Sequence, residues 1–176
     1  MRSLGRLDRG LLLLARTRGH PPGVDRAVSF YSRLGEHGAC WLALGGAGAV
    51  LDRDRGRRAR WLRGVRVVVA AYGLNYAVKL AVRRRRPQLR GLPPLTPTVS
   101  RLSFPSAHAT TSFAAACAFS SVAQPAALYG TSVLFAVSRP YLGVHYPSDV
   151  LAGAVPGSVL AGVWSQPATG GGCVCP

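Results

Sequence analysis

Acidic residues and lysine are scarce in this chain. Among its 176 residues only six are Asp or Glu, and Asp149 is the single one after residue 54. Lys79 is the one lysine among 22 basic residues, so arginine carries nearly all of the positive charge. The net charge of +16 is compatible with nucleic acid as a partner. Nucleic-acid-binding domains, however, usually carry mixed Lys/Arg patches on soluble folds that also have their share of acids. The two shortages therefore argue against nucleic acid.

Apolar runs rich in Ala, Val, Leu and Gly alternate with basic loops. The runs cover residues 38–51, 61–82, 105–122, 126–137 or 126–142, and 148–164. This alternation favours short membrane spans, and the small residues would let the helices pack closely. A soluble helical bundle is the alternative, because hydropathy separates a buried helix poorly from a membrane span. The sequence predicts an all-α, multi-pass transmembrane helical bundle in the cell membrane.

A single domain is expected, with a short segment on either side of it. Residues 1–37 contain seven arginines but no apolar stretch of about 18 residues, which predicts an interfacial or weakly spanning helix. Residues 38–164 hold all of the apolar runs and form the predicted membrane domain. Residues 165–176 are Gly-rich and are expected to be a flexible tail.

The few amines, imidazoles and acids after residue 54 all lie at the ends of predicted spans. They are Lys79, His108, His145 and Asp149, and Arg86 and Arg139 fall at the same level. If successive helices alternate in direction, these ends meet on one side of the bundle. Such a group of cations suits a phosphate, because guanidinium groups bind phosphate oxygens in pairs and an ammonium adds a point charge. Taken singly, each residue is more commonly a snorkelling or capping group, so the argument rests on their coincidence.

The segment Phe-Pro-Ser-Ala-His places a proline where a helix begins. The N–H groups of Ser106, Ala107 and His108 are therefore expected to face an anion. His145 and Asp149 are four residues apart, which on a helical turn places them on one face. A carboxylate that holds one ring nitrogen leaves the other free to attack phosphorus, while His108 can protonate the leaving oxygen.

Three segments of the chain resemble the signature of one known family. They are Lys79, six residues, Arg86-Pro87; then Pro105-Ser-Ala-His108; then Ser138-Arg139, five residues, His145, three residues, Asp149. This pattern resembles that of the type 2 phosphatidic acid phosphatase (PAP2) family, whose superfamily includes vanadium haloperoxidases. The spacing matches over residues 79–149, with Ala107 at the position where the family usually has glycine. Alanine keeps the backbone N–H but gives up easy access to positive φ.

The resemblance implies a role for each residue of the signature. The residues implied to hold the phosphate are Lys79, Arg86, Ser106, Ala107 and Arg139. It further implies that His108 is the acid, His145 the nucleophile and Asp149 its orienting partner. The family uses no metal or other cofactor, and its fold is an all-helical bundle, which predicts five to six helices here.

A closer resemblance covers most of the chain. The stretch SRLSFPSAHAT, the upstream LGEHG and the small size resemble actinobacterial phosphatases of decaprenyl-linked phosphoribose, which act in the synthesis of cell-wall arabinan. This implies that the substrate is a lipid-linked sugar phosphate, with Glu36 and His37 either reaching the sugar or merely ending a helix. The alternatives are another lipid phosphate (phosphatidylglycerophosphate, phosphatidate or a polyprenyl diphosphate), a non-catalytic membrane scaffold, and a soluble vanadate-binding enzyme. If residues 1–37 do not cross the membrane, their arginines favour a cytoplasmic site.

Overall fold

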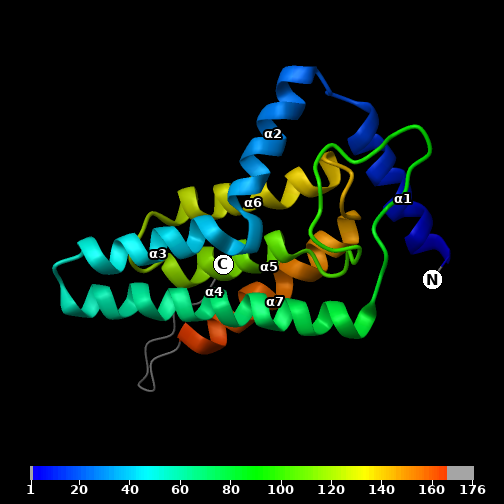
Figure 1. Cartoon of the computed structure of the whole chain (residues 1–176). Coiled ribbons are helices and arrows are strands. Elements are labelled where there is room, and N and C mark those ends of the chain that lie inside the picture. Colours follow the sequence, from blue (N-terminus) through cyan, green and yellow to red (C-terminus); the bar gives the residue numbers. More distant parts are fainter. Residues whose placement is uncertain (1, 166–176) are drawn as a thin grey trace.

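A computed structural model describes residues 2–165 of the chain, and these residues form helices and loops without a β-strand. Seven α-helices and one short 3₁₀-helix follow one another in the order shown in Figure 1. They are α1 (Arg2–Thr17), α2 (Pro22–Leu34), η1 (Glu36–Gly38), α3 (Ala39–Leu51), α4 (Arg55–Val82), α5 (Ala107–Phe119), α6 (Pro125–Tyr141) and α7 (Pro147–Ser165).

Local sequence signals explain where the long helices begin. The side chain of Asp54 precedes α4 and accepts a hydrogen bond from the backbone N–H of Arg57 at 2.6 Å. The side chain of Gln124 caps α6 in the same way, and Pro125 occupies the first helical position, where a missing N–H costs nothing.

Helix α5 is the centre of the bundle and packs against α4, α6 and α7 (Figure 1). Nearly all of its residues are buried, so it is enclosed rather than amphipathic. Its approach to α7 is close enough to require glycine. A Cβ atom at Gly153 would lie 2.6 Å from the carbonyl oxygen of Ser106, and one at Gly157 would overlap the backbone of Thr110. These glycines therefore set how tightly α7 holds the start of α5.

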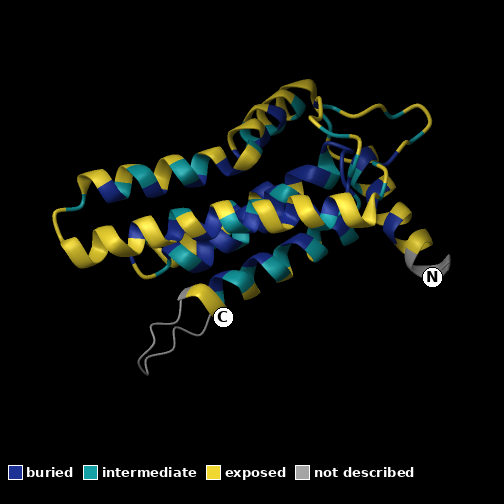
Figure 2. Cartoon of the chain, turned by 60° about the horizontal axis from the view of Figure 1, so that its bottom comes forward, coloured by how far each residue is buried: buried dark blue, intermediate teal, exposed yellow. Residues whose placement is uncertain are grey.

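Helix α7 has an apolar face on the outside of the bundle. Helix α7 exposes Leu151, Val155, Val159 and Val163, which recur every fourth residue along one face (Figure 2). By length and hydropathy, α4 is the one helix among residues 2–165 that is long and apolar enough to cross a membrane. Its 28 residues span about 42 Å, whereas the 13 residues of α5 span only about 20 Å.

The all-α class predicted from the sequence is confirmed, and the five apolar runs correspond to α3 to α7. The count exceeds the predicted five to six helices because residues 1–37 contain two helices, α1 and α2, separated by a turn around Gly19 and Pro21. Helix α4 also begins earlier than its apolar run, at the basic residue Arg55. The predicted tail lies outside the described residues, except for Ser165, which ends α7.

The two N-terminal helices lie at one end of the bundle. There α1 packs against α6 and α7, and α2 packs against α6 (Figure 1). The same end holds the last turns of α4 and α6 and the first turns of α5 and α7. The polar residues of the three sequence motifs are therefore gathered at this end.

Candidate active site

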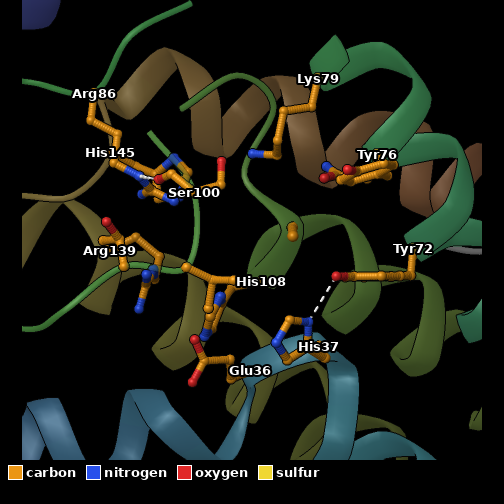
Figure 3. Close-up of a pocket in the computed structure, with 14 residues that line it drawn as sticks. Glu36, His37, Tyr72, Tyr76, Lys79, Arg86, Ser100, His108, Arg139 and His145 are labelled. Atoms are coloured by element: carbon orange, nitrogen blue, oxygen red, sulfur yellow. Dashed lines mark hydrogen bonds between the residues drawn. The ribbon is translucent and has the colours of Figure 1, made fainter. Parts of the chain in front are cut away.

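The predicted polar residues surround a pocket of about 110 Å³ at this end of the bundle (Figure 3). The predicted residues that line it are Lys79, Arg86, Ala107, His108, Arg139 and His145, together with Glu36 and His37. Ser106 and Asp149 are fully buried next to it. All of the residues selected from the sequence are thus brought to one place.

His145 lies in the loop between α6 and α7 and is 2% exposed. Its Nε2 atom is 3.0 Å from Nη1 of Arg86. Arginine can only donate, so Nε2 accepts this hydrogen bond and the proton of the neutral ring is on Nδ1. The lone pair of Nε2 therefore faces the cations of the pocket.

The charge state of His145 follows from its surroundings. Burial, together with the positive charges of Arg86, Arg139 and Lys79, lowers the pKa of His145 well below its usual value. The imidazole is therefore neutral near pH 7, and a neutral ring is the form that can attack phosphorus.

The contact between His145 and Asp149 differs from the sequence prediction. Helix α7 begins at Pro147, so the two residues do not share a helical face, and Nδ1 lies 3.6 Å from Oδ2 of Asp149. This distance is longer than a hydrogen bond. The carboxylate of Asp149 instead accepts from the backbone N–H of Tyr146 at 2.9 Å and from Nη1 of Arg84 at 2.8 Å.

His108 is in the first turn of α5 and is held by α2. Its Nε2 atom donates to the carbonyl oxygen of Ser32 at 2.8 Å, which leaves Nδ1 as the ring nitrogen that can pass a proton. The hydroxyl of Ser32 accepts from Nη1 of Arg139 at 2.5 Å. One residue of α2 thus fixes two functional side chains at once.

Lys79 and Arg86 are oriented by backbone carbonyls of two loops, the one that joins α4 to α5 and the one that joins α6 to α7. The ammonium of Lys79 donates to the carbonyl of Pro105 at 3.0 Å. Arg86 donates from Nε to the carbonyl of Ser100 at 2.7 Å and from Nη1 to that of Val144 at 2.8 Å. Burial lowers the pKa of Arg86 to about 10, which still leaves it charged near pH 7. Both cations keep donors available for an anion.

The start of α5 departs in one respect from the predicted anion site. The backbone N–H of Ser106 is not available to a ligand, because it donates to the carbonyl of Asp149 at 2.9 Å. Ala107 and His108 occupy the first two positions of α5, where an N–H has no acceptor within the helix. The prediction is therefore wrong for the backbone N–H of Ser106 and stays a prediction for those of Ala107 and His108.

Glu36 and His37 form the turn between α2 and α3 and face the pocket from the side opposite Arg86 (Figure 3). Nδ1 of His37 is 2.7 Å from the hydroxyl of Tyr72. His37 has a φ of 54°, an unusual backbone conformation that places it beside the pocket.

Comparison with known proteins identifies the family. The model of the PAP2 superfamily matches residues 61–169, which is more than half of the chain. The chain belongs to the PAP2 superfamily. A decaprenylphosphoryl-5-phosphoribose phosphatase of Mycolicibacterium smegmatis is 40% identical over 135 residues, covering 75% of this chain and 72% of the relative. The protein of that name from Mycobacterium tuberculosis is 37% identical over 146 residues, covering 81% and 79%.

Two solved structures share the PAP2 fold with this chain. A transmembrane PAP2-type phosphatidylglycerolphosphate phosphatase from Bacillus subtilis matches with a TM-score of 0.75 and 23% identity, covering 93% of this chain and 85% of that one. LpxE of Aquifex aeolicus matches with a TM-score of 0.69 and 23% identity, covering 90% and 94%. These similarities confirm the fold class predicted from the sequence.

Among the polar residues that sequence reasoning missed, three support the predicted ones from behind. Ser32 supports His108 and Arg139, while Asp8 and Arg84 lie behind Asp149. Asp8 could have been noticed as one of only six acids, but nothing in the run of four arginines at 83–86 distinguishes Arg84 from its neighbours. Over residues 2–165, no group of three or more His, Cys, Asp or Glu side chains is arranged to hold a metal ion.

Proposed function

We propose that this chain is a membrane phosphatase that removes the 5-phosphate of decaprenylphosphoryl-5-phosphoribose through a phosphohistidine at His145. Membership of the PAP2 superfamily and two relatives of 37–40% identity support this substrate. The observation that carries the chemistry is the position of His145, whose Nε2 faces a cluster of cations that line the pocket.

The cation cluster has the composition expected of a phosphate site. Lys79, Arg86 and Arg139 converge on the pocket, and their hydrogen bonds go to carbonyl or hydroxyl oxygens and, for Arg86, to Nε2 of His145. Nε of Arg139 and the hydroxyl of Ser106 are buried and make no hydrogen bond with any described residue. A phosphate dianion would neutralise the cluster and supply the missing acceptors.

The reaction requires two transfers of the phosphoryl group. In the first, the lone pair of Nε2 of His145 forms a bond to phosphorus while the bond from phosphorus to the sugar oxygen breaks. His108, protonated on both ring nitrogens in the substrate complex, donates the proton of Nδ1 to that oxygen, which leaves as an alcohol. In the second, His108 takes a proton from water, the water oxygen attacks phosphorus, and the bond from phosphorus to His145 breaks to release inorganic phosphate.

Binding of phosphate would also prepare the nucleophile. Without a ligand, Nη1 of Arg86 donates to the lone pair of Nε2 of His145. A phosphate oxygen is a stronger acceptor than an imidazole nitrogen, so it would draw this N–H away and leave Nε2 free to attack. The backbone carbonyls of Ser100 and Val144 would keep the guanidinium in place during the change.

The proposed recognition of the sugar depends on Glu36 and His37. Both line the pocket, and a carboxylate and an imidazole are suitable partners for ribose hydroxyls. Phosphate release from a panel of purified lipids tests the proposal. We expect the decaprenyl-linked phosphoribose to give the highest kcat/KM, and Glu36→Gln to lower it roughly tenfold while leaving phosphatidate hydrolysis unchanged.

The panel should include phosphatidylglycerophosphate, phosphatidate and a polyprenyl diphosphate. A preference for any of these would overturn the substrate assignment while leaving the phosphatase activity intact. An equal effect of Glu36→Gln on all substrates would show that Glu36 supports the structure of the pocket and does not bind the sugar. His145→Ala, purified in the same way, controls for contaminating phosphatases.

We propose further that the chain is a multi-pass membrane protein with its site on the cytoplasmic side. The site end of the bundle carries the N-terminal helices with their seven arginines and the arginine run at 83–86. The opposite end carries fewer arginines, mainly around the start of α4. An excess of Arg and Lys marks the cytoplasmic side of a membrane protein.

Reporter fusions at the C-terminus test this orientation, because α7 runs from the site to the opposite end of the bundle (Figure 1). With a cytoplasmic site, alkaline phosphatase fused after α7 should be active and green fluorescent protein fused there should be dark. The reverse pattern would place the site on the outer face.

A further inference from the structure

A chain of ion pairs lies behind Asp149, on the side away from the pocket. Nη1 of Arg84 is 2.8 Å from Oδ1 of Asp149, and Nη2 of Arg84 is 2.7 Å from Oδ2 of Asp8. Asp149 is fully buried and Asp8 is 5% exposed. One guanidinium thus joins the carboxylate beside His145 to a carboxylate of the N-terminal helix α1.

The start of α7 completes this arrangement. Ser148 donates to Asp8 from its backbone N–H at 3.0 Å and from its hydroxyl at 2.6 Å. The guanidinium of Arg84 lies 4.1 Å from the ring centroid of Tyr146, a cation–π contact that keeps its plane fixed. Arg83, the preceding residue, is exposed and donates only to a nearby carbonyl of its own helix. The contact with both carboxylates therefore belongs to Arg84 and not to the basic run as a whole.

Charge explains why two carboxylates would be needed. Asp149 paired with Arg84 alone would be neutral, whereas Asp8, Arg84 and Asp149 together carry one net negative charge. His145 faces three cations, Lys79, Arg86 and Arg139, and becomes positive itself when its Nε2 binds phosphorus. A net negative charge behind the ring opposes that accumulation, and the interaction is strengthened because both carboxylates are buried.

We propose that Asp8 and Arg84 are positioning residues for the nucleophile: Arg84 fixes the carboxylate of Asp149 toward His145, and Asp8 restores the negative charge that Arg84 would otherwise cancel. Neither residue belongs to the three sequence motifs, and the first is supplied by a helix outside the PAP2 match at 61–169. The inference rests on the proposed function, in which His145 is the nucleophile.

The test is Asp8→Asn, which keeps the shape of the side chain and removes its charge. We expect kcat to fall roughly 10- to 100-fold, the usual effect of losing a group that orients a functional side chain from behind. KM should stay within about threefold, because the cations that bind phosphate are unchanged. Removing a negative charge disfavours the protonated ring, so the acidic limb of the pH–kcat profile should move to lower pH.

The groups that face His145 and could also shift the acidic limb of the pH–kcat profile must be kept constant. They are Lys79, Arg86, His108, Arg139 and Asp149. None of them is altered in Asp8→Asn. Arg84→Gln should reproduce the loss of kcat, and the double variant should be no worse than the more impaired single variant if the two residues act as one unit. Asp8→Glu, which keeps the charge, should restore much of the activity.

Two control variants separate positioning from docking of the N-terminal helices. Asp25 accepts from Tyr141 at 2.7 Å and pairs with His20 at 2.8 Å, so Asp25→Asn weakens the attachment of the turn between α1 and α2 without touching Asp149. Arg83→Gln removes the positive charge that directly precedes Arg84 at the end of α4. Both should leave kcat and the pH profile near those of the unmodified protein, with melting temperatures in detergent recorded for every variant.

A folded Asp8→Asn variant with unchanged kcat and pH profile would overturn the inference, as would an equal loss in Asp25→Asn. Failure of the proposed function has a different signature, which is no phosphate release from any lipid by the unmodified protein. In that case the pH dependence of modification of His145 by diethyl pyrocarbonate, read by mass spectrometry, still reports its protonation. An unchanged midpoint in Asp8→Asn would then reject the inference by itself.

Discussion

Replacement of His145 by alanine is expected to abolish phosphate release, with kcat falling at least about 10³-fold on every lipid phosphate. In the proposed mechanism, the Nε2 lone pair of this ring attacks a phosphate held by Lys79, Arg86 and Arg139. Alanine leaves those cations in place, so binding of orthovanadate should persist while turnover is lost. Phosphate release and vanadate binding, measured on the same detergent-solubilised preparation, check the expectation.

His20→Ala is the matched control for this experiment. His20 lies in the turn between α1 and α2, stacked on Tyr141 at 4.3 Å between ring centroids and away from the pocket. Its loss should leave turnover largely intact. Turnover that survives His145→Ala unchanged would show that another group attacks phosphorus, and the phosphohistidine mechanism would be wrong.

The sequence predicted the fold well because two independent signals agree on it. Each apolar run became one of the helices α3 to α7, and the three motifs fall at the ends of those helices. Alternating helix direction then brings Lys79, His108 and Arg139 together without any knowledge of side-chain packing. The position of these residues is a property of chain topology, which periodicity and hydropathy can reveal.

What the sequence could not predict depends on contacts between distant segments. Spacing placed His145 and Asp149 on one helical face, but Pro147 starts α7 two residues too late for that. The proline at the start of α5 also predicted that the N–H of Ser106 faces an anion. In the structure this N–H donates to the carbonyl of Asp149 instead. The pairing of Asp8 with Arg84 joins residues 76 positions apart, and no local pattern encodes such a contact.

Loss of the proton donor should produce a second large effect that depends on the leaving group. For His108→Gln we expect kcat on an alkyl phosphate such as the phosphoribose lipid to fall about 10²- to 10⁴-fold, the usual contribution of a general acid. Gln can still donate to the carbonyl of Ser32, as Nε2 of His108 does at 2.8 Å, but it cannot give up a proton to a leaving alkoxide. The support from α2 is therefore kept while the chemistry is removed.

A substrate with a good leaving group tests this role directly. p-Nitrophenolate leaves without a proton, so His108→Gln should form the phosphoenzyme from p-nitrophenyl phosphate at close to the normal rate. Hydrolysis of the phosphoenzyme needs His108 as a base, so the intermediate should accumulate and appear as a burst of about one nitrophenolate per site. Equal losses on both substrates without a burst would mean that His108 acts by holding α5 against Ser32 rather than by transferring a proton. Because the burst requires a working nucleophile, it also detects the covalent phosphoenzyme in the variant where its breakdown is slowest, and the burst should be absent when His145→Ala is added.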